Sequence, residues 1–168
     1  MKEVKLQATL HVLREEELSN DDKRLVDKAK EMTQHSYAPY SRFRVGAAVL
    51  LADGTIVGGS NQENAAYPSG LCAERTTLFY ANSQYPDQAV CALAIAARTE
   101  SGFIDRPISP CGACRQVILE TEKRFGGPIR ILLYGKEETY LVEGIGALLP
   151  LSFDGSDMEP ANQPSYES

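Results

Sequence analysis

The sequence predicts an α/β fold in which helices pack against a sheet, and three observations support that class. Segments with strand-like and helix-like patterns alternate along the chain. Apolar and polar residues alternate over residues 4–12, which indicates a strand with one buried face. Residues 90–97 are almost wholly apolar, as expected for a central strand covered on both faces. The 168 residues suffice for one domain with its own hydrophobic core.

The remaining elements follow from caps, turns and helix breakers. A helix is expected over residues 20–34, because Ser19 is a suitable N-cap and Pro39 ends the helical region. The dipeptide Asp53-Gly54 between apolar runs predicts a hairpin turn. The strands of this hairpin would span residues 43–51 and 55–59. Two further helices and two further strands are expected at residues 72–81, 111–124, 129–134 and 139–142.

Composition and charge restrict the classes of function. The formal net charge of −6 argues against non-specific binding to nucleic acid, which needs a basic surface. No apolar run approaches the roughly 20 residues that cross a bilayer, and the first residues lack the apolar region of a signal peptide. We therefore expect a cytoplasmic protein with no membrane or nucleic-acid partner. Residues 1–168 should form a single domain, with 1–18 as an N-terminal extension and 154–168 as a disordered tail.

Two short motifs contain three of the four cysteines and carry the predicted chemistry. The first is Leu71-Cys72-Ala73-Glu74-Arg75, and the second spans residues 110–116 and contains Cys111 and Cys114. Cys111 and Cys114 are neighbours on one face of a helical turn, and three thiolates suffice to hold a zinc ion with an open fourth position. Glu74 would transfer protons beside that position. This order of residues is typical of zinc nucleobase deaminases.

Geometry and charge set two conditions on such a site. In an ideal helix Cys72 and Glu74 lie about 200° apart, so both face the metal only if Cys72 is at the helix cap. Three thiolates and Zn²⁺ sum to a charge of about −1, which nearby cations should offset. Arg75 is the main candidate for this support and Arg115 is the second.

Other interpretations of the cysteines stay open at this point. A Cys-x-x-Cys pair also occurs in thioredoxin-like redox sites, which would give no role to Cys72 and Glu74. A closed structural zinc site would need a fourth protein ligand, and the two histidines, His11 and His35, lack motif spacing. The leftover Cys91 lies in an apolar strand, where we expect a small buried core residue.

Beyond these motifs, the chain resembles the small, homotetrameric, three-cysteine cytidine deaminases over about residues 20–153. The resemblance is carried by the two zinc motifs and by two further segments, residues 37–48 and 61–68. It implies a three-layer α/β/α sandwich with a five-stranded mixed sheet. The strand at residues 4–12 would be additional to that sheet. The loops around residues 84–87 and 99–105 look longer than in compact members of the family.

The resemblance also implies a role for each matching residue. Cys72, Cys111 and Cys114 would hold one Zn²⁺ per subunit, and Glu74 would be the catalytic proton carrier. Asn61 and Glu63 would bind the ribose 3′-hydroxyl, Phe43 would pack against the base, and Ala73 is also assigned to substrate binding. Tyr67 would reach the site of a neighbouring subunit, and Phe153 resembles the aromatic residue that adjacent subunits contribute.

The implied activity is zinc-dependent hydrolytic deamination of cytidine and 2′-deoxycytidine to uridine and 2′-deoxyuridine, a step of pyrimidine salvage. Asn61 and Glu63 are two residues apart, so in an extended segment both side chains point the same way. A carboxylate near the sugar repels phosphate, which favours a free nucleoside over a nucleotide. Three alternatives remain: a blasticidin-S-type or nucleotide deaminase, a polynucleotide editor, and a zinc-binding assembly module without catalysis.

Overall fold

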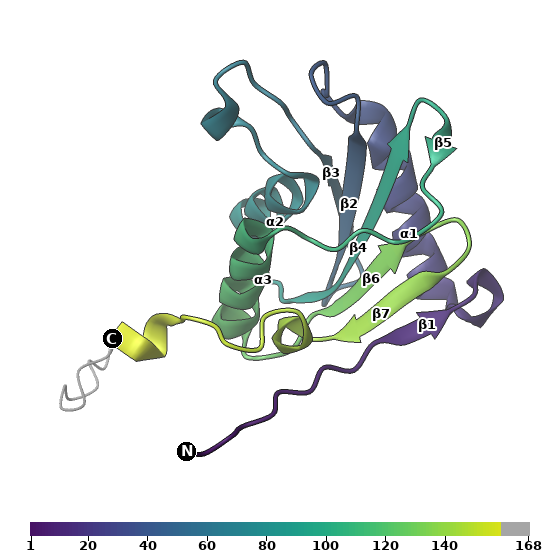
Figure 1. The fold of residues 1–168 in the computed structure, drawn as a ribbon. Coiled ribbons are helices and arrows are strands. Elements are labelled where there is room, and N and C mark those ends of the chain that lie inside the picture. Colours follow the sequence, from purple (N-terminus) through teal and green to yellow (C-terminus); the bar gives the residue numbers. More distant parts are fainter. Residues whose placement is uncertain (159–168) are drawn as a thin grey trace.

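A mixed β-sheet lies between one helix and a pair of helices in the computed structural model, which describes residues 1–158 (Figure 1). Strands β4 and β6 are parallel, and the other neighbouring strands are antiparallel. In spatial order the strands are β1 (His11–Leu13), β7 (Thr139–Glu143), β6 (Arg130–Tyr134), β4 (Val90–Thr99), β2 (Arg44–Leu51) and β3 (Ile56–Ser60), with β5 (Gly102–Phe103) paired to β4. The five strands of the predicted mixed sheet are present, β1 adds an N-terminal strand that is shorter than predicted, and β5, which was not predicted, makes the sheet seven-stranded.

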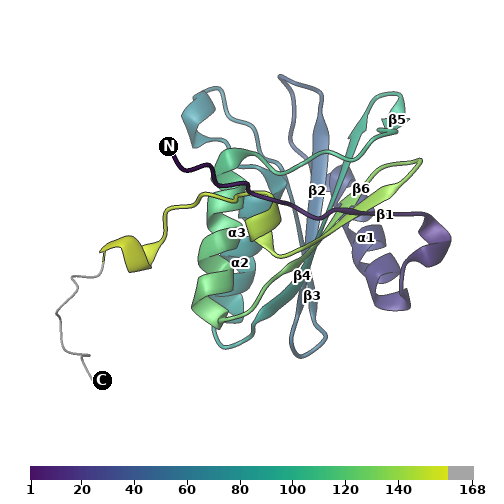
Figure 2. The same ribbon diagram turned by 60° about the horizontal axis from the view of Figure 1, so that its bottom comes forward.

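The helices cover the two faces of the sheet unequally. Helix α1 (Asn20–Met32) lies on one face, and α2 (Ala73–Gln84) and α3 (Gly112–Phe125) lie together on the other (Figure 2). Ser19 caps α1 as predicted and accepts a hydrogen bond from the amide of Asp22 at 3.1 Å. This arrangement is the predicted three-layer α/β/α sandwich. Short 3₁₀ turns occur at Glu15–Glu17, Thr33–His35, Tyr67–Ser69, Ile145–Ala147 and Gly155–Met158.

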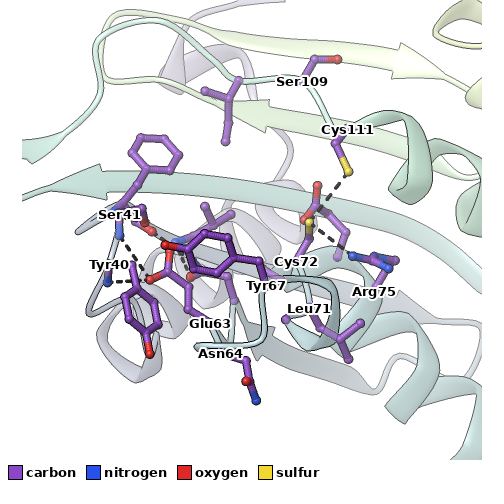
Figure 3. A pocket seen from close by; sticks show the side chains of 17 residues that line it. Tyr40, Ser41, Glu63, Asn64, Tyr67, Leu71, Cys72, Arg75, Ser109 and Cys111 are labelled. Atoms are coloured by element: carbon purple, nitrogen blue, oxygen red, sulfur yellow. Dashed lines mark hydrogen bonds between the residues drawn. The ribbon is translucent and has the colours of Figure 1, made fainter.

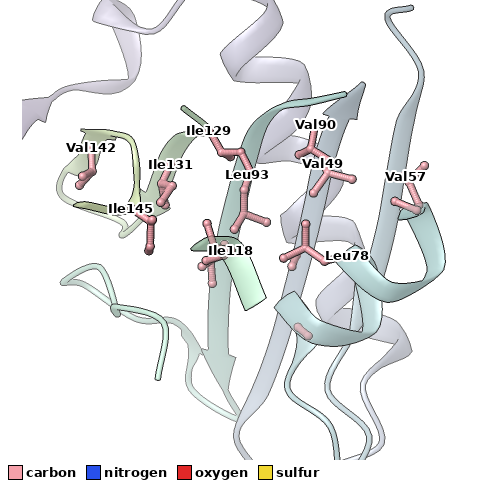
Figure 4. Packing of buried hydrophobic residues seen from close by; sticks show 14 of the residues in the cluster. Val49, Val57, Leu78, Val90, Leu93, Ile118, Ile129, Ile131, Val142 and Ile145 are labelled. Carbon is pink, nitrogen blue, oxygen red and sulfur yellow. The ribbon is translucent and has the colours of Figure 1, made fainter. Parts of the chain in front are cut away.

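The core has two halves because successive side chains of the central strand β4 point to opposite faces. Leu93 and Ile95 pack under α2 and α3 with Leu78 and Ile118 (Figure 4). Ala92, Ala94 and Ala96 of β4 pack with α1 instead, and their small side chains let that helix approach closely. Strand β4 is thus buried on both faces, as its apolar run predicts.

The closest approach of helix to sheet is at Gly46 in β2. A side chain there would collide with the backbone of α1 and the following turn, at Ala29, Met32 and Thr33. Glycine is therefore required at this position by packing.

Two local predictions were wrong. Only His11–Leu13 of the predicted strand at residues 4–12 is a strand, and the expected buried face is exposed at Val4 and Leu6. In the register of β1 and β7 the last residue of β7, Glu143, lies opposite Thr9, so residues 4–8 have no strand to pair with. Cys91 is exposed rather than buried. It is the residue skipped where the β2–β4 register shifts between Leu50 and Leu51, so the regular alternation does not apply to it.

The end of the described chain packs against α3. Lys123 pairs with Asp154 at 2.7 Å, and a 3₁₀ turn follows at Gly155–Met158. The rest of the segment that we expected to be a disordered tail, residues 159–168, lies outside the described residues. Within residues 1–158, every helix is too short or too polar to cross a bilayer.

Candidate active site

Two helix N-termini bring the three motif cysteines together. Cys72 is the N-cap of α2 and Cys111 is the N-cap of α3, both with extended backbone, and Cys114 lies in the first turn of α3. Cys72 is therefore outside the helix proper, as the geometric condition on Cys72 and Glu74 required. The Cys72 and Cys111 sulfurs are 3.8 Å apart, those of Cys111 and Cys114 are 3.4 Å apart, and all three lie within 4.8 Å of one another.

This donor set fits a zinc ion. A tetrahedral zinc with Zn–S bonds of about 2.3 Å separates its sulfur ligands by about 3.8 Å, close to the observed spacing. Among residues 1–158 these cysteines form the only cluster of metal-binding side chains, and no histidine or carboxylate belongs to it. A closed structural site would need a fourth ligand of that kind, so the cluster fits one zinc per subunit with an open position. A redox pair would not need Cys72 at all.

The protonation of the thiols suits metal binding. Hydrogen bonding from Cys114 and then from Arg75, whose Nη2 is 3.8 Å from the Cys72 sulfur, lowers the pKa of Cys72 to about 5. The same bond to Cys72, together with burial, raises the pKa of the Cys114 thiol. The Cys72 thiol therefore ionises more readily, and the Cys114 thiol holds its proton more strongly. A metal cation would displace that proton.

Glu74 is a buried carboxyl next to the cluster. Its side chain is 5 % exposed, and burial, followed by the charge of Cys72, raises its pKa. A carboxyl whose pKa is raised toward neutral pH can both accept and donate a proton there, whereas an exposed carboxyl is almost wholly ionised. Glu74 is thus suited to carry protons in both directions.

A cavity of about 740 Å³ opens in front of Glu74, Cys72 and Cys111 (Figure 3). Its size is within the range of small-molecule sites. Of the predicted site residues, it is lined by Phe43, Asn61, Glu63, Tyr67, Cys72, Ala73, Glu74, Arg75 and Cys111. Cys114 is fully buried behind it. The residues that sequence reasoning placed in two zinc motifs and two flanking segments therefore surround a single space.

The two polar residues on the sugar-binding segment are already engaged by the protein. The Asn61 side chain accepts hydrogen bonds from Ser36 Oγ at 2.5 Å and Val45 N at 2.9 Å, and donates to Phe43 O at 3.0 Å. It therefore holds the start of β2. Glu63 Oε2 accepts from Tyr40 N at 2.9 Å and Ser41 N at 3.2 Å.

These bonds also keep the Glu63 carboxyl charged. Hydrogen bonding from the Ser41 hydroxyl, and then from the backbone of Tyr40 and Ser41, lowers the pKa of Glu63. Asn61 and Glu63 both face the cavity, and Gln62 between them does not line it. The extended-segment argument from the sequence therefore holds for the direction of these side chains.

Two aromatic residues differ in their placement. Tyr67 lines the cavity of its own chain, is 75 % exposed, and stacks edge-on against Tyr40 with ring centres 5.9 Å apart. Phe153 does not line the cavity and is 60 % exposed, and its carbonyl accepts a bond from Gln116 at 2.9 Å. A single chain thus brings Tyr67 to the site and leaves Phe153 outside it.

The two arginines adjacent to ligands have different partners. Arg75 donates to the Cys72 sulfur, which raises the pKa of the guanidinium and agrees with the predicted charge support. The side chain of Arg115 instead donates to Ser109, Pro110 and Leu148. Of the two candidates for charge support, Arg75 therefore contacts a thiol, whereas the guanidinium of Arg115 is engaged by neutral oxygens.

Sequence reasoning missed several residues that line the cavity. They are Tyr40, Ser41, Val45, Asn64, Gly70, Leu71, Ile108 and Ser109. Most lie in irregular loops, where no periodicity indicates which way a side chain points. Ser109 had one available signal, because it lies two residues before the ligand Cys111.

Comparisons with known proteins connect this site to one family. The family model described as "Cytidine and deoxycytidylate deaminase zinc-binding region" matches residues 19–125, which include the three cysteines and Glu74. A cytidine deaminase of Halalkalibacterium halodurans is 39% identical over 138 residues, covering 82% of this chain and 98% of that relative. One from Sporosarcina psychrophila is 40% identical over 141 residues, covering 84% and 97%.

Solved structures are similar as well. A crystal structure of cytidine deaminase from Burkholderia pseudomallei matches with a TM-score of 0.67 and 39% identity, over 77% of this chain and 97% of that chain. Cytidine deaminase from Mycobacterium tuberculosis matches with a TM-score of 0.60 and 32% identity, over 78% and 95%.

Proposed function

Because the chain belongs to the family of deaminases that share the cytidine and deoxycytidylate deaminase zinc-binding region, we propose that it deaminates cytidine and 2′-deoxycytidine hydrolytically. The products are uridine or 2′-deoxyuridine and ammonia, as in pyrimidine salvage. One observation carries this proposal: three zinc-compatible thiols and the buried Glu74 meet at the inner end of a cavity large enough for a nucleoside.

Proton transfer is the task of Glu74. When bound by the three cysteines, zinc supplies Lewis acidity that makes a water molecule easier to deprotonate. Glu74 accepts the proton of the attacking water and delivers it to N3 of the ring as oxygen adds at C4. It then takes the proton of the new hydroxyl group at C4 and delivers it to the amine, which leaves as ammonia when the C4–N bond breaks and the C4 carbonyl forms. One carboxyl serves both steps because it regains its proton between them, which the raised pKa of Glu74 favours.

The outer part of the cavity recognises the nucleoside. Phe43 packs against the base, Ala73 contacts the substrate, and the free hydrogen-bonding capacity of Asn61 and Glu63 takes up the sugar hydroxyl. The lowered pKa of Glu63 supports a charged carboxylate beside the sugar. Such a charge repels a phosphate, so nucleosides are preferred over nucleotides.

Assembly and location extend the same proposal. The subunit is a single domain of residues 1–168 and forms a homotetramer in the cytoplasm. Tyr67 and Phe153 contribute to the sites of neighbouring subunits, which is supported by their large exposure in the isolated chain. The four free thiols in residues 1–158 are compatible with a reducing compartment.

Ammonia release tests this function directly. Purified protein with quantified zinc would be offered cytidine, 2′-deoxycytidine, cytidine monophosphate and blasticidin S. We expect release from the two nucleosides and little from the nucleotide. Ammonia release from only the nucleotide or blasticidin S would show that the enzyme has a different substrate. Fully zinc-loaded protein that releases no ammonia from any of the four would contradict the proposal.

A further inference from the structure

The side chain of Arg115 bridges two segments that lie outside the helices and strands, residues 109–110 and Leu148. Its Nε donates to Pro110 O at 2.8 Å, Nη2 to Ser109 Oγ at 3.0 Å, and Nη1 to Leu148 O at 2.6 Å. Its backbone amide also donates to Cys111 O at 2.9 Å, in the first turn of α3. Every nitrogen of the guanidinium thus donates a hydrogen bond to another part of the chain, and all three acceptors are neutral oxygens.

The segment that Arg115 holds carries one of the three thiols. The chain between β5 and α3 has no regular structure, and it ends at Pro110 directly before Cys111. Proline has no N–H, so the backbone of Pro110 itself can be anchored by hydrogen bonding only through its carbonyl. Cys114 lies inside a helix, whereas Cys111 is at the N-cap of that helix, held on one side by its own carbonyl and on the other by this segment. The bond from Arg115 to Pro110 O supplies that anchoring.

The other end of the bridge is rigid. Leu148 is the C-cap of the turn Ile145–Ala147, whose Ile145 is buried in the core, and Leu148 itself packs against that core. Arg115 therefore ties the segment before Cys111 to a part of the chain that cannot easily move. Since Ile108 and Ser109 also line the cavity, the same bridge supports one wall of the substrate space.

We infer that Arg115 is a positioning residue: it holds Ser109, Pro110 and Cys111 in the geometry that retains zinc and shapes the cavity wall. This role differs from that of Arg75, which acts on the Cys72 sulfur by direct contact. It requires the three-way geometry of a guanidinium, so a lysine of equal charge cannot replace it. The inference rests on the proposed zinc chemistry, but metal retention can be measured without any turnover.

The test compares the same substitution at two places on α3. Arg115→Lys keeps the charge and loses most of the bridge. Arg124→Lys is the matched control, because Arg124 donates to a single carbonyl, Pro86 O at 2.9 Å, far along the helix from the cysteines. Zinc-loaded proteins would be mixed with a chromogenic chelator and the rate of zinc transfer recorded. Melting temperature of the zinc-free proteins and kcat and KM for cytidine would be measured in parallel.

We expect Arg115→Lys to release zinc about tenfold faster than wild type, as is typical when a residue that orients a ligand is lost. Its KM should rise several-fold, whereas Arg124→Lys should match wild type in both. Adding methylguanidinium to Arg115→Ala should slow zinc release again, because the added group can occupy the vacated position. Equal zinc release from the two lysine variants would overturn the inference.

A second variant covers the case in which Arg115→Lys fails to fold. Ser109→Ala removes one acceptor of the bridge and leaves the arginine intact. We expect it to accelerate zinc release by a smaller factor, with an unchanged melting temperature of the zinc-free protein. A wild-type rate in Ser109→Ala together with no rescue of Arg115→Ala would also overturn the inference. If zinc release follows these expectations but the protein deaminates no substrate, the positioning role of Arg115 is supported and the proposed function is rejected.

Discussion

Replacing Glu74 by glutamine tests proton transfer with little disturbance of the fold. The side chain is 5 % exposed and burial raises its pKa, so a neutral amide of the same size should be tolerated without loss of stability. Glutamine cannot carry a proton between water and substrate. General acid–base catalysis contributes about 10²–10⁴-fold for each step, and Glu74 is proposed to act in two. We therefore expect kcat to fall by at least about 10⁴-fold, which is about 5.5 kcal/mol of activation free energy.

The assay is ammonia release at saturating cytidine, with zinc content and nucleoside affinity measured on the same protein. Zinc should remain bound and affinity should change little, because Glu74 is not one of the clustered thiols. Glu122→Gln is a suitable control. Glu122 Oε1 accepts bonds from the amides of Ile129 at 2.8 Å and Ile145 at 2.9 Å, so replacing this charged acceptor by a neutral amide oxygen should lower stability slightly while kcat stays unchanged. A fully zinc-loaded Glu74→Gln with a kcat within tenfold of wild type would refute the assigned role.

Four further outcomes follow from the structure. Gly46→Ala should lower the free energy of unfolding by about 1–3 kcal/mol in urea titrations, because the added methyl meets helix backbone, whereas Gly127→Ala in open space should be nearly neutral. In zinc-free protein the lowered Cys72 pKa keeps the thiolate down to about pH 5. Alkylation of that peptide by iodoacetamide, followed by mass spectrometry, should therefore persist at acidic pH and decline only below that value; a decline near pH 8 would contradict it. Asn61→Ala should both raise KM and destabilise by about 1–3 kcal/mol, since it leaves buried partners unpaired; unchanged stability would reject its role in holding β2. Chelation of zinc should abolish ammonia release and lower the melting temperature, and added zinc should restore both.

The sequence predicts some residues of the candidate site in more detail than others. Cys72, Cys111, Cys114 and Glu74 could be predicted because their order along the chain is typical of zinc deaminases and because Cys111 and Cys114 share a helix turn. The cap position of Cys72 could be stated only as a condition, since φ and ψ at a helix end depend on the loop that leads into it. Structure adds that Cys72 and Cys111 occupy equivalent positions at two adjacent helix ends.

Prediction failed where a residue depends on partners distant in the chain. The alternation over residues 4–12 is real, but a strand also needs a neighbour, and β7 extends only to Glu143. Cys91 lies at a register shift between two strands, which no single-strand pattern reveals. In both cases the apolar and polar residues alternate locally as a strand requires, but the pairing with a neighbouring strand decides which side chains are buried, and that pairing cannot be deduced from one segment.

By itself the sequence predicted helices packed on a sheet, a zinc site of three cysteines and Glu74 as the candidate proton carrier, because strand alternation, helix caps and Cys-x-x-Cys spacing are local properties. Only the tertiary structure decided what Arg115 does. It neighbours a ligand in sequence and was therefore the second candidate for offsetting the thiolate charge, yet one of its acceptors, Leu148, lies 33 residues away. The physical reason is that a guanidinium binds whichever oxygens the folded chain places in its plane, and sequence spacing beyond one helical turn does not specify them.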